Sequence, residues 1–393
     1  MAPLTPEQRE AVERRDGPLL VRAGAGSGKT RVLVERFVAA VREDGVPADR
    51  ILAVTFTEKA AAEMRSRVRA RLVEEGDREA ARAAESAAIA TIHGFCARLL
   101  RASALAAGLD PDFRVLDETE AARVALDAFD GALEEFLASA AAGDRLDLAA
   151  AYGPDRLRTM VVAVHGRLRS RGESEPSLPP VAAPRAGEER ERLARAVAAA
   201  AAELAAGGRS GAAVERAAGT LERCDRLLGR LPAGELAEPD DLAALEVKAG
   251  NAAALKTPAF EELREAHAAY LTLCEAARAA AHHAMLARLL ELFGARYAAL
   301  KEERSALDFE DLELLARDLL AAGGLGEAYR SRFELVMVDE FQDTNRLQCE
   351  LLDLVAREGR SNLFTVGDEL QSIYGFRGAD LEVFREWRQA AEA

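Results

Sequence analysis

The residues with the clearest chemistry lie near the start of the chain, in LLVRAGAGSGKTRVLVERF, residues 19–37. An apolar run leads into a glycine-rich turn, and a helix-like segment follows. Backbone N–H groups of such a turn, together with the helix N-terminus, bind the phosphates of a nucleotide. Lys29 would reach the β- and γ-phosphates, and Thr30 would hold Mg²⁺. The predicted nucleotide-binding loop consists of Ala23, Gly24, Ala25, Gly26, Ser27, Gly28, Lys29 and Thr30.

Two departures from common patterns narrow the type of loop. The strict phosphate-binding pattern has glycine where Ala23 stands, so this loop is an alanine-first variant. A dinucleotide-binding fingerprint would need its third glycine where Lys29 stands. Glycine-rich turns before helices are also common without any ligand. The GKT sequence between an apolar run and a helix-like segment nevertheless favours nucleotide binding.

A second apolar run, in ELVMVDEFQDT (residues 334–344), ends in two carboxylates. Asp339 could hold Mg²⁺ through water, and Glu340 could orient and deprotonate an attacking water. A strand that ends in Asp-Glu is more often a capped turn. Its occurrence together with the phosphate-binding loop favours the catalytic interpretation.

Short β-rich runs at 18–23, 51–56, 88–92, 334–340 and 362–368 are separated by helix-like segments or by longer insertions. This alternation predicts an α/β fold with a parallel sheet and crossover helices. Between about 110 and 305 the sequence is rich in alanine and arginine and reads as helical. We therefore expect a sheet domain formed by 1–109 and 305–393, with a helical subdomain inserted at 110–304.

The bulk composition is that of a soluble intracellular protein. At 393 residues, the chain is long enough for two or three domains. The formal net charge of -15 argues mildly against a polyanionic partner, although a local basic channel can lie on an acidic body. The four cysteines have no metal-ligand spacing and read as free thiols. No signal-peptide core or membrane-spanning run is evident.

Six segments, taken in order, resemble the motifs of superfamily 1 helicases of the UvrD/Rep type. They are LTPEQREAV, AGAGSGKT, VTFTEKAAAEMRSRV, TIHGFC, VDEFQDT and VGDELQSIYGFRGAD. TIHGFC, FRVLDETEA and LDFEDL are most similar to the RecB/AddA branch. The resemblance covers about 1–120 and 300–393. It implies a P-loop NTPase fold (RecA-like), with helices on both faces of the sheet and an inserted all-helical subdomain.

The resemblance also implies roles for single residues. Gln8 would read the adenine edge of ATP, although Thr5, Pro6 and Gln8 could equally form a helix capping box. Gln371 and Arg377 would face the γ-phosphate and join Lys29, Asp339 and Glu340 as catalytic residues. The DNA-binding residues would be Phe56, His93, Tyr374 and Phe376, the aromatic ones by stacking on bases. The implied cofactors are ATP and Mg²⁺, with Thr30 and Asp339 as the metal ligands.

Some positions depart from the pattern of the family. Glu369 and Leu370 stand where Pro-Lys is usual, and Gly375 stands where arginine is usual, so contacts to phosphate or DNA could be weaker there. A second motor domain, with the arginines that stabilise phosphoryl transfer, has no counterpart in these residues. We therefore expect the N-terminal part of a longer helicase, weakly active or inactive on its own.

Two functional hypotheses remain from the sequence. The first is the ATP-binding motor domain of a DNA helicase or translocase, with 3′-to-5′ polarity implied by the resemblance and a role in repair or recombination. The second is a nucleotide- and single-stranded-DNA-binding module that hydrolyses little and acts within a complex. Expected partners are single-stranded DNA, duplex/single-strand junctions and a nuclease or helicase subunit, with no membrane. The expected location is the bacterial cytoplasm, in association with the nucleoid.

Overall fold

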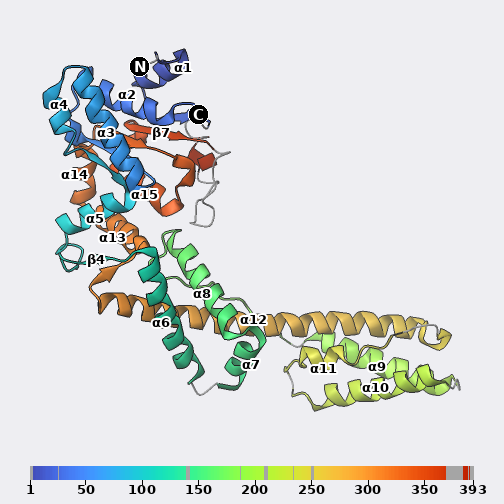
Figure 1. Cartoon of the computed structure of the whole chain (residues 1–393). Helices are drawn as coiled ribbons and strands as arrows, with labels where there is room; N and C mark the ends of the chain where they lie inside the picture. Colours follow the sequence, from blue (N-terminus) through green and yellow to red (C-terminus); the bar gives the residue numbers. More distant parts are fainter. Residues whose placement is uncertain are drawn as a thin grey trace. The chain divides into compact units, whose positions relative to one another are not determined.

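A computed structural model describes residues 3–24, 26–138, 142–185, 187–207, 211–232, 234–248, 252–368, 384–387 and 389. The chain forms two compact units (Figure 1). The first consists of Met1–Glu135, Pro154–Pro176 and Leu290–Ala393, and the second of Phe136–Gly153 and Ser177–Leu289. Residues 110–135, 154–176 and 290–304 thus group with the first unit. The domain boundaries expected at 109/110 and 304/305 stay predictions.

A five-stranded parallel sheet lies at the centre of the first unit, in the order β1-β7-β6-β2-β3. Each of the five β-rich runs of the sequence supplies one strand, so the predicted α/β fold with a parallel sheet is confirmed. The strands are β1 (Leu19–Arg22), β2 (Ile51–Thr55), β3 (Ala88–Thr91), β6 (Leu335–Val338) and β7 (Leu363–Gly367). Strand β2 is buried along its whole length, which explains the apolar run of its first four residues, 51–54.

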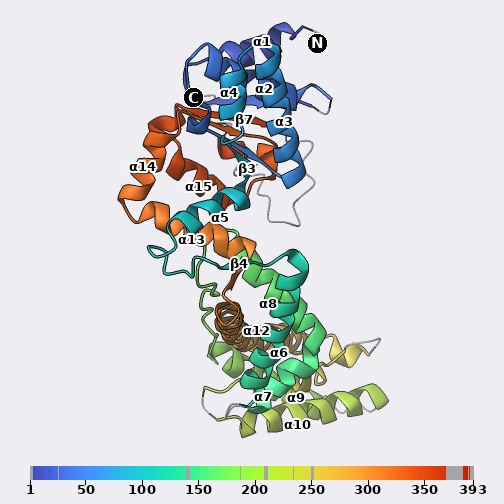
Figure 2. The same cartoon turned by 60° about the vertical axis from the view of Figure 1, so that its left-hand side comes forward.

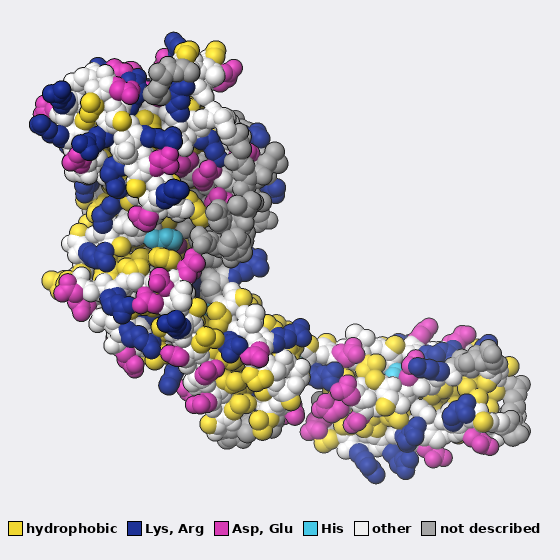
Figure 3. Space-filling model, in the orientation of Figure 1, with side chains coloured by type: hydrophobic (Ala, Val, Ile, Leu, Met, Phe, Trp, Pro, Cys, Tyr) yellow, Lys and Arg dark blue, Asp and Glu magenta, His cyan; other side chains and the backbone are white. Residues whose placement is uncertain are grey.

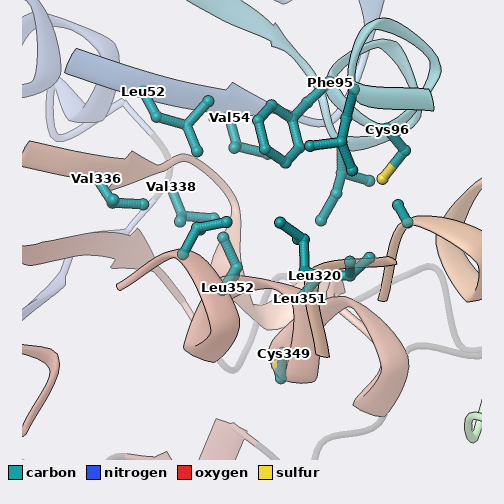
Figure 4. Close-up of a cluster of buried hydrophobic side chains, with 14 of the residues drawn as sticks. Leu52, Val54, Phe95, Cys96, Leu320, Val336, Val338, Cys349, Leu351 and Leu352 are labelled. Carbon is teal, nitrogen blue, oxygen red and sulfur yellow. The ribbon is translucent and has the colours of Figure 1, made fainter. Parts of the chain in front are cut away.

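Helices cover both faces of this sheet (Figures 1 and 2). Side chains alternate between the faces along β2, because successive residues of a strand point in opposite directions. Ile51 faces α2 (Lys29–Arg42) and α3 (Glu58–Glu74), where Phe37 and Met64 are buried. Leu52 and Val54 face the other core, which contains Phe95 (Figure 4). That second core is formed with α5 (Ile92–Ala102), α13 (Phe309–Ala321) and α15 (Arg346–Val355).

The N-terminus of α13 is fixed by buried ion pairs. Asp308 is its N-cap and forms a capping box with Asp311. Lys301 Nζ lies 2.6 Å from Asp308 Oδ2 and 2.5 Å from Asp311 Oδ2, and Arg169 pairs with Asp311 Oδ1 at 2.5 Å. Buried charges are costly unless they are paired in this way. The network holds α13 against the end of α12 (Pro258–Glu302) and against α8 (Pro154–Arg169).

The remaining elements of the first unit are further helices, of which α6 ends in the second unit, and a small two-stranded sheet. Strands β4 and β5 pair in parallel. The elements are α1 (Pro6–Glu13), α4 (Arg78–Ala83), α6 (Glu118–Leu137), α14 (Gly324–Arg332), β4 (Arg114–Val115) and β5 (Ala306–Leu307), with 3-10 turns at Ala48–Arg50, Phe341–Asp343 and Glu358–Arg360.

The second unit is helical and has a core of its own. It contains α7 (Ala142–Tyr152), α9 (Glu188–Ala206), α10 (Ala212–Arg230), α11 (Pro239–Ala243), a 3-10 turn at Ala253–Leu255 and most of α12. Leu193, Leu221, Phe260 and Tyr270 are among its fully buried side chains. The Tyr270 hydroxyl accepts a hydrogen bond from the Ala237 N–H at 3.2 Å. Within the described ranges, no helix is both long and apolar enough to cross a membrane.

Candidate functional site

The candidate site lies where the carboxyl ends of the parallel strands meet. Because all five strands run in the same direction, the residues that follow them gather at one edge of the sheet. The phosphate-binding loop follows β1, and Asp339 follows β6. Phe56 follows β2, and His93 lies two residues after β3. Neighbouring strands therefore bring the predicted nucleotide residues and two predicted DNA residues to the same edge.

The loop before α2 has the backbone geometry of a phosphate-binding turn. Gly26 has a φ of 74° and Gly28 a φ of 88°, a region that favours glycine. Ser27 closes the turn, since its N–H and its hydroxyl both donate to Gly24 O, at 3.2 and 2.7 Å. Helix α2 begins at Lys29, and its N-cap residue, Gly28, has no side chain with which to cap the first turn. Its first N–H groups can therefore bind an anion. Ala25 lies outside the described residues.

Gln8 takes one of the two roles that the sequence left open, the capping box, and also contacts the phosphate-binding loop. Its N–H donates to Thr5 Oγ1 and its Oε1 accepts from the Thr5 N–H, which is the capping box of α1. Its Nε2 also donates to Ser27 O at 2.8 Å. A Cβ added to Gly28 would lie 3.0 Å from this Nε2, so the loop and the amide are in close contact. The amide lies beside the phosphate-binding loop, and its recognition of adenine stays a prediction.

Lys29 and Glu340 connect the loop with the end of β6. Lys29 Nζ lies 2.5 Å from Glu340 Oε2, and its side chain is 10% exposed against 35% for Glu340. Glu340 has a φ of 49°, an uncommon conformation for a residue with a side chain. Such positions concentrate at functional sites. The two predicted catalytic groups are therefore in direct contact.

Asp339 lies beside this pair in a different environment. Burial, and second the charge of Glu340, raise the pKa of Asp339 to about 6. The Glu340 N–H donates to Asp339 Oδ1 at 3.0 Å. This hydrogen bond and the charge of Lys29 act to lower the pKa of Asp339. A cation near Asp339 would favour its ionised form.

The donor set of the predicted Mg²⁺ site is of the right chemical type. Thr30 offers a hydroxyl oxygen in the first turn of α2, and Asp339 offers a carboxylate. Both are hard oxygen ligands, and Mg²⁺ characteristically takes one or two carboxylates together with substrate phosphates and water. Among the described residues, no cluster of three or more His, Cys, Asp or Glu side chains could hold a metal by itself. The residues present fit a cation that is held jointly with phosphate.

Gln342 is a part of the site that sequence reasoning missed. It is 1% exposed, and its Nε2 donates to Glu340 Oε2 at 3.0 Å and to Asp343 Oδ2 at 3.2 Å. Its Oε1 accepts from the Asp368 N–H at 2.9 Å, just past β7. A Cβ on Gly367 would lie 2.7 Å from this oxygen, so glycine is needed there. The amide thus fixes Glu340 relative to the end of the neighbouring strand.

The two described DNA candidates follow β2 and β3, farther along the same edge. Phe56 is partly exposed at the end of β2. Thr91 is the N-cap of α5, accepting from the Gly94 N–H at 3.0 Å and donating to Glu58 Oε1 at 2.6 Å. This bond joins the start of α5, where His93 lies, to the first turn of α3.

His93 is held by helix α13. Its Nε2 lies 3.0 Å from Glu313 Oε1, and its ring stacks on Phe309 with a centroid distance of 4.5 Å and an interplanar angle of 27°. Glu313 also accepts from Gln348 Nε2 at 2.7 Å. Glu313 and Gln348 carried no signal in the sequence, because their partners are far away along the chain. The other predicted residues, Gln371, Tyr374, Phe376 and Arg377, lie outside the described residues.

The comparisons with known proteins agree with this geometry. The family model described as "UvrD/REP helicase N-terminal domain" matches residues 4–392. The A subunit of an ATP-dependent helicase/nuclease from Desulforudis audaxviator is 35% identical over 97% of this chain and 36% of its own length. Proteins of the same name from Pelotomaculum thermopropionicum and Moorella thermoacetica are each 34% identical, over 97% and 99% of this chain and 35% and 32% of theirs.

The chain spans about a third of the length of these curated relatives. The predicted relationship to UvrD/Rep-type helicases and to the AddA branch is confirmed. The family match covers nearly every residue of the chain and includes both the phosphate-binding loop and the Asp339–Glu340 edge. The chain therefore belongs to the UvrD/REP helicase N-terminal domain family.

Proposed function

We propose that this chain is the ATP-binding motor domain of an ATP-dependent DNA helicase or translocase that acts in DNA repair or recombination in the bacterial cytoplasm, at the nucleoid. The observation that carries the proposal is the contact of Lys29 with Glu340 across the loop, with Asp339 beside them. These are the groups that phosphoryl transfer requires: a phosphate clamp, a metal ligand and a water-orienting carboxylate. The 3′-to-5′ polarity rests on the family resemblance alone.

Different residues of the chain have different roles in ATP binding and hydrolysis. The loop 23–30 and the N-terminus of α2 bind the phosphates, and Gln8 lies where it can contact the adenine. Lys29 has three N–H donors, so it can bind a phosphate oxygen without releasing Glu340. Glu340, held by Lys29 and Gln342, orients the attacking water and accepts its proton.

Thr30 and Asp339 are the proposed ligands of Mg²⁺. When bound, Mg²⁺ neutralises the charge that develops on the phosphates. Ionised Asp339 is the form that coordinates a metal, and a cation would favour this form against the effect of burial. Gln371 and Arg377 are proposed as further contacts to the γ-phosphate.

Single-stranded DNA is proposed to bind along the adjacent part of the sheet edge. Phe56, Tyr374 and Phe376 would stack on bases, and His93 would contact the strand. Figure 3 shows positive and negative side chains interspersed over one face of the first unit. Together with the net charge of -15, this favours aromatic stacking over a broad basic stripe as the main source of affinity. The further proposed partners are duplex/single-strand junctions and a nuclease or helicase subunit.

A second candidate is a nucleotide- and DNA-binding module with little hydrolysis of its own. The observation that favours it is the state of Glu340, whose Oε2 already receives Lys29 and Gln342. A carboxylate oxygen that already accepts from two donors has no ready place for the hydrogen of a water until one partner moves.

Replacement of Glu340 separates the two candidates. In Glu340→Gln, we expect nucleotide binding to remain and DNA-stimulated ATP turnover to fall by about 10²–10⁴-fold, as for loss of a general base. The matched control is Glu334→Gln, because Glu334 lies just before β6, at the opposite end of that strand, and pairs with Arg50. Steady-state phosphate release with and without single-stranded DNA gives the answer. Equal turnover in Glu340→Gln and the unaltered chain would remove the catalytic assignment.

A further inference from the structure

Two residues of α13, one helical turn apart, hold the same imidazole ring. Phe309 stacks on His93, and Glu313 pairs with its Nε2 at 3.0 Å. The side chain of His93 is 33% exposed, whereas that of Glu313 is 2% exposed. His93 therefore connects a buried carboxylate to the surface at the strand edge where DNA is proposed to bind.

Glu313 is itself held in place. Its Oε1 also accepts from Gln348 Nε2, and Gln348 forms a capping box with Asn345 at the start of α15. Asn345 follows the loop that carries Asp339 and Glu340. A buried carboxylate is costly unless such hydrogen bonds compensate its desolvation. The bonds leave Glu313 little freedom to turn away from His93.

Burial of the Glu313 carboxylate costs desolvation free energy, and packing alone does not require a charged side chain at this position. Phe95, Leu312 and Leu352 form an apolar core on the same side of the sheet, and an apolar residue would pack there at lower cost. A functional site is preorganised when its contact residues are locked by packing and by a second layer of hydrogen bonds. A locked imidazole loses less conformational entropy when it binds a ligand.

We propose that Glu313 is a positioning residue that holds His93 in the orientation needed to contact single-stranded DNA, with Phe309 as the second support. This inference rests on the proposed function and adds Glu313, which lies outside the segments that resemble the family motifs. In this proposal, Glu313 affects DNA binding only by orienting His93.

A double-mutant cycle tests the proposal on the 393-residue chain. The variants are His93→Ala, Glu313→Gln and the two combined, with Glu334→Gln as the matched control at the opposite edge of the sheet. The readouts are the Kd for a fluorescent oligo-dT, the Kd for a non-hydrolysable ATP analogue without DNA, and the thermal midpoint. Glu313→Gln keeps the shape of the side chain and removes its charge.

We expect His93→Ala and Glu313→Gln each to weaken DNA binding by about threefold to tenfold, the value of one hydrogen bond. The combined variant should bind DNA no more weakly than His93→Ala alone, because both changes remove the same contact. Affinity for the ATP analogue should stay within about twofold. The proposal would be overturned if the effects of His93→Ala and Glu313→Gln on the DNA Kd multiply in the combined variant. It would also be overturned if Glu313→Gln leaves the DNA Kd unchanged.

A second variant keeps the test decisive if Glu313→Gln does not fold. Phe309→Leu removes the stacked ring and leaves an apolar side chain, and it should also weaken DNA binding without adding to His93→Ala. Phe56→Ala distinguishes a failure of this inference from a failure of the proposed function. If it weakens DNA binding while the His93, Glu313 and Phe309 variants do not, only this inference fails. If the unaltered chain binds no DNA, the proposed function fails together with it.

Discussion

Asp339 and Glu340 are adjacent in the chain, yet their carboxylates have different surroundings. Glu340 is held by Lys29 and Gln342, whereas Asp339 is partly buried and receives a backbone N–H. The proposed roles, Glu340 as the base and Asp339 as a metal ligand, rest on the family resemblance and on the contact of Glu340 with Lys29.

The environment of Asp339 predicts that its replacement stabilises the fold. Burial and the charge of Glu340 raise its pKa to about 6, so its ionised form is disfavoured in the folded protein. We expect Asp339→Asn to raise the free energy of unfolding at pH 7.5 by about 1–2 kcal/mol. Asn keeps an oxygen for the Glu340 N–H. Thermal midpoints in metal-free buffer measure the effect.

The sign of the pH dependence follows from the raised pKa. In the unaltered chain, protonation of Asp339 favours the folded state, and this stabilisation is lost as the pH rises through about 6. The advantage of Asp339→Asn should therefore shrink between pH 7.5 and pH 5. An advantage that is the same at both values would contradict the assigned environment.

At the scale of elements, Gln342 joins the turn after β6 to the end of β7. Its Oε1 lies so close to the backbone of β7 that a Cβ on Gly367 would meet it at 2.7 Å, with Gln342 N and Phe384 Cε2 each at 3.2 Å. These atoms are buried or on the backbone and have little room to move. The absence of a side chain at Gly367 is thus part of the way in which the two strand ends are joined.

We expect Gly367→Ala to destabilise the chain by about 1–3 kcal/mol, the usual cost of overpacking a tight site. It should also weaken ATP turnover, because it displaces Gln342 and therefore Glu340. The control is Gly166→Ala within α8, where an added Cβ would meet nothing within 4 Å. That change should be neutral or stabilising. Chemical denaturation of both variants gives the comparison, and equal stabilities would refute the close contact.

At the scale of the whole molecule, the two units have separate cores. Phe364 on β7 belongs to a core of the sheet unit, and Phe260 on α12 belongs to the core of the helical unit. Both side chains are almost fully buried. The two positions therefore form a matched pair for separating the contributions of the units.

We expect Phe260→Ala and Phe364→Ala each to cost about 3–5 kcal/mol in the unit that contains them. Only Phe364→Ala should weaken binding of an ATP analogue, because only that unit contains the phosphate-binding loop. Calorimetry with and without the analogue measures both effects. Ligand should raise the transition of the sheet unit alone. Equal loss of nucleotide affinity in the two variants would show that the helical unit takes part in the site.

The parts of the fold that the sequence predicted are local ones. Each strand is an apolar run of a few residues, and the phosphate-binding loop is contiguous, so short windows of sequence contain the whole signal. The capping box of Thr5 and Gln8 is local as well. The contacts that were missed join distant residues: Gln8 with Ser27, Gln342 with Asp368, and His93 with Glu313. These contacts depend on which strands become neighbours in the sheet, and the hydrophobic periodicity of the sequence does not predict the strand order.

The assignment of residues 23–30 as an ATP site is tested by an equilibrium titration of the chain with a fluorescent, non-hydrolysable ATP analogue and Mg²⁺. Lys29→Ala removes the proposed phosphate clamp, and Lys248→Ala, an exposed lysine in the helical unit, is the control. We predict that Lys248→Ala binds as the unaltered chain does and that Lys29→Ala binds about tenfold or more weakly, since a charge-assisted hydrogen bond is lost. Equal affinity in all three proteins would contradict the assignment of residues 23–30 as an ATP site.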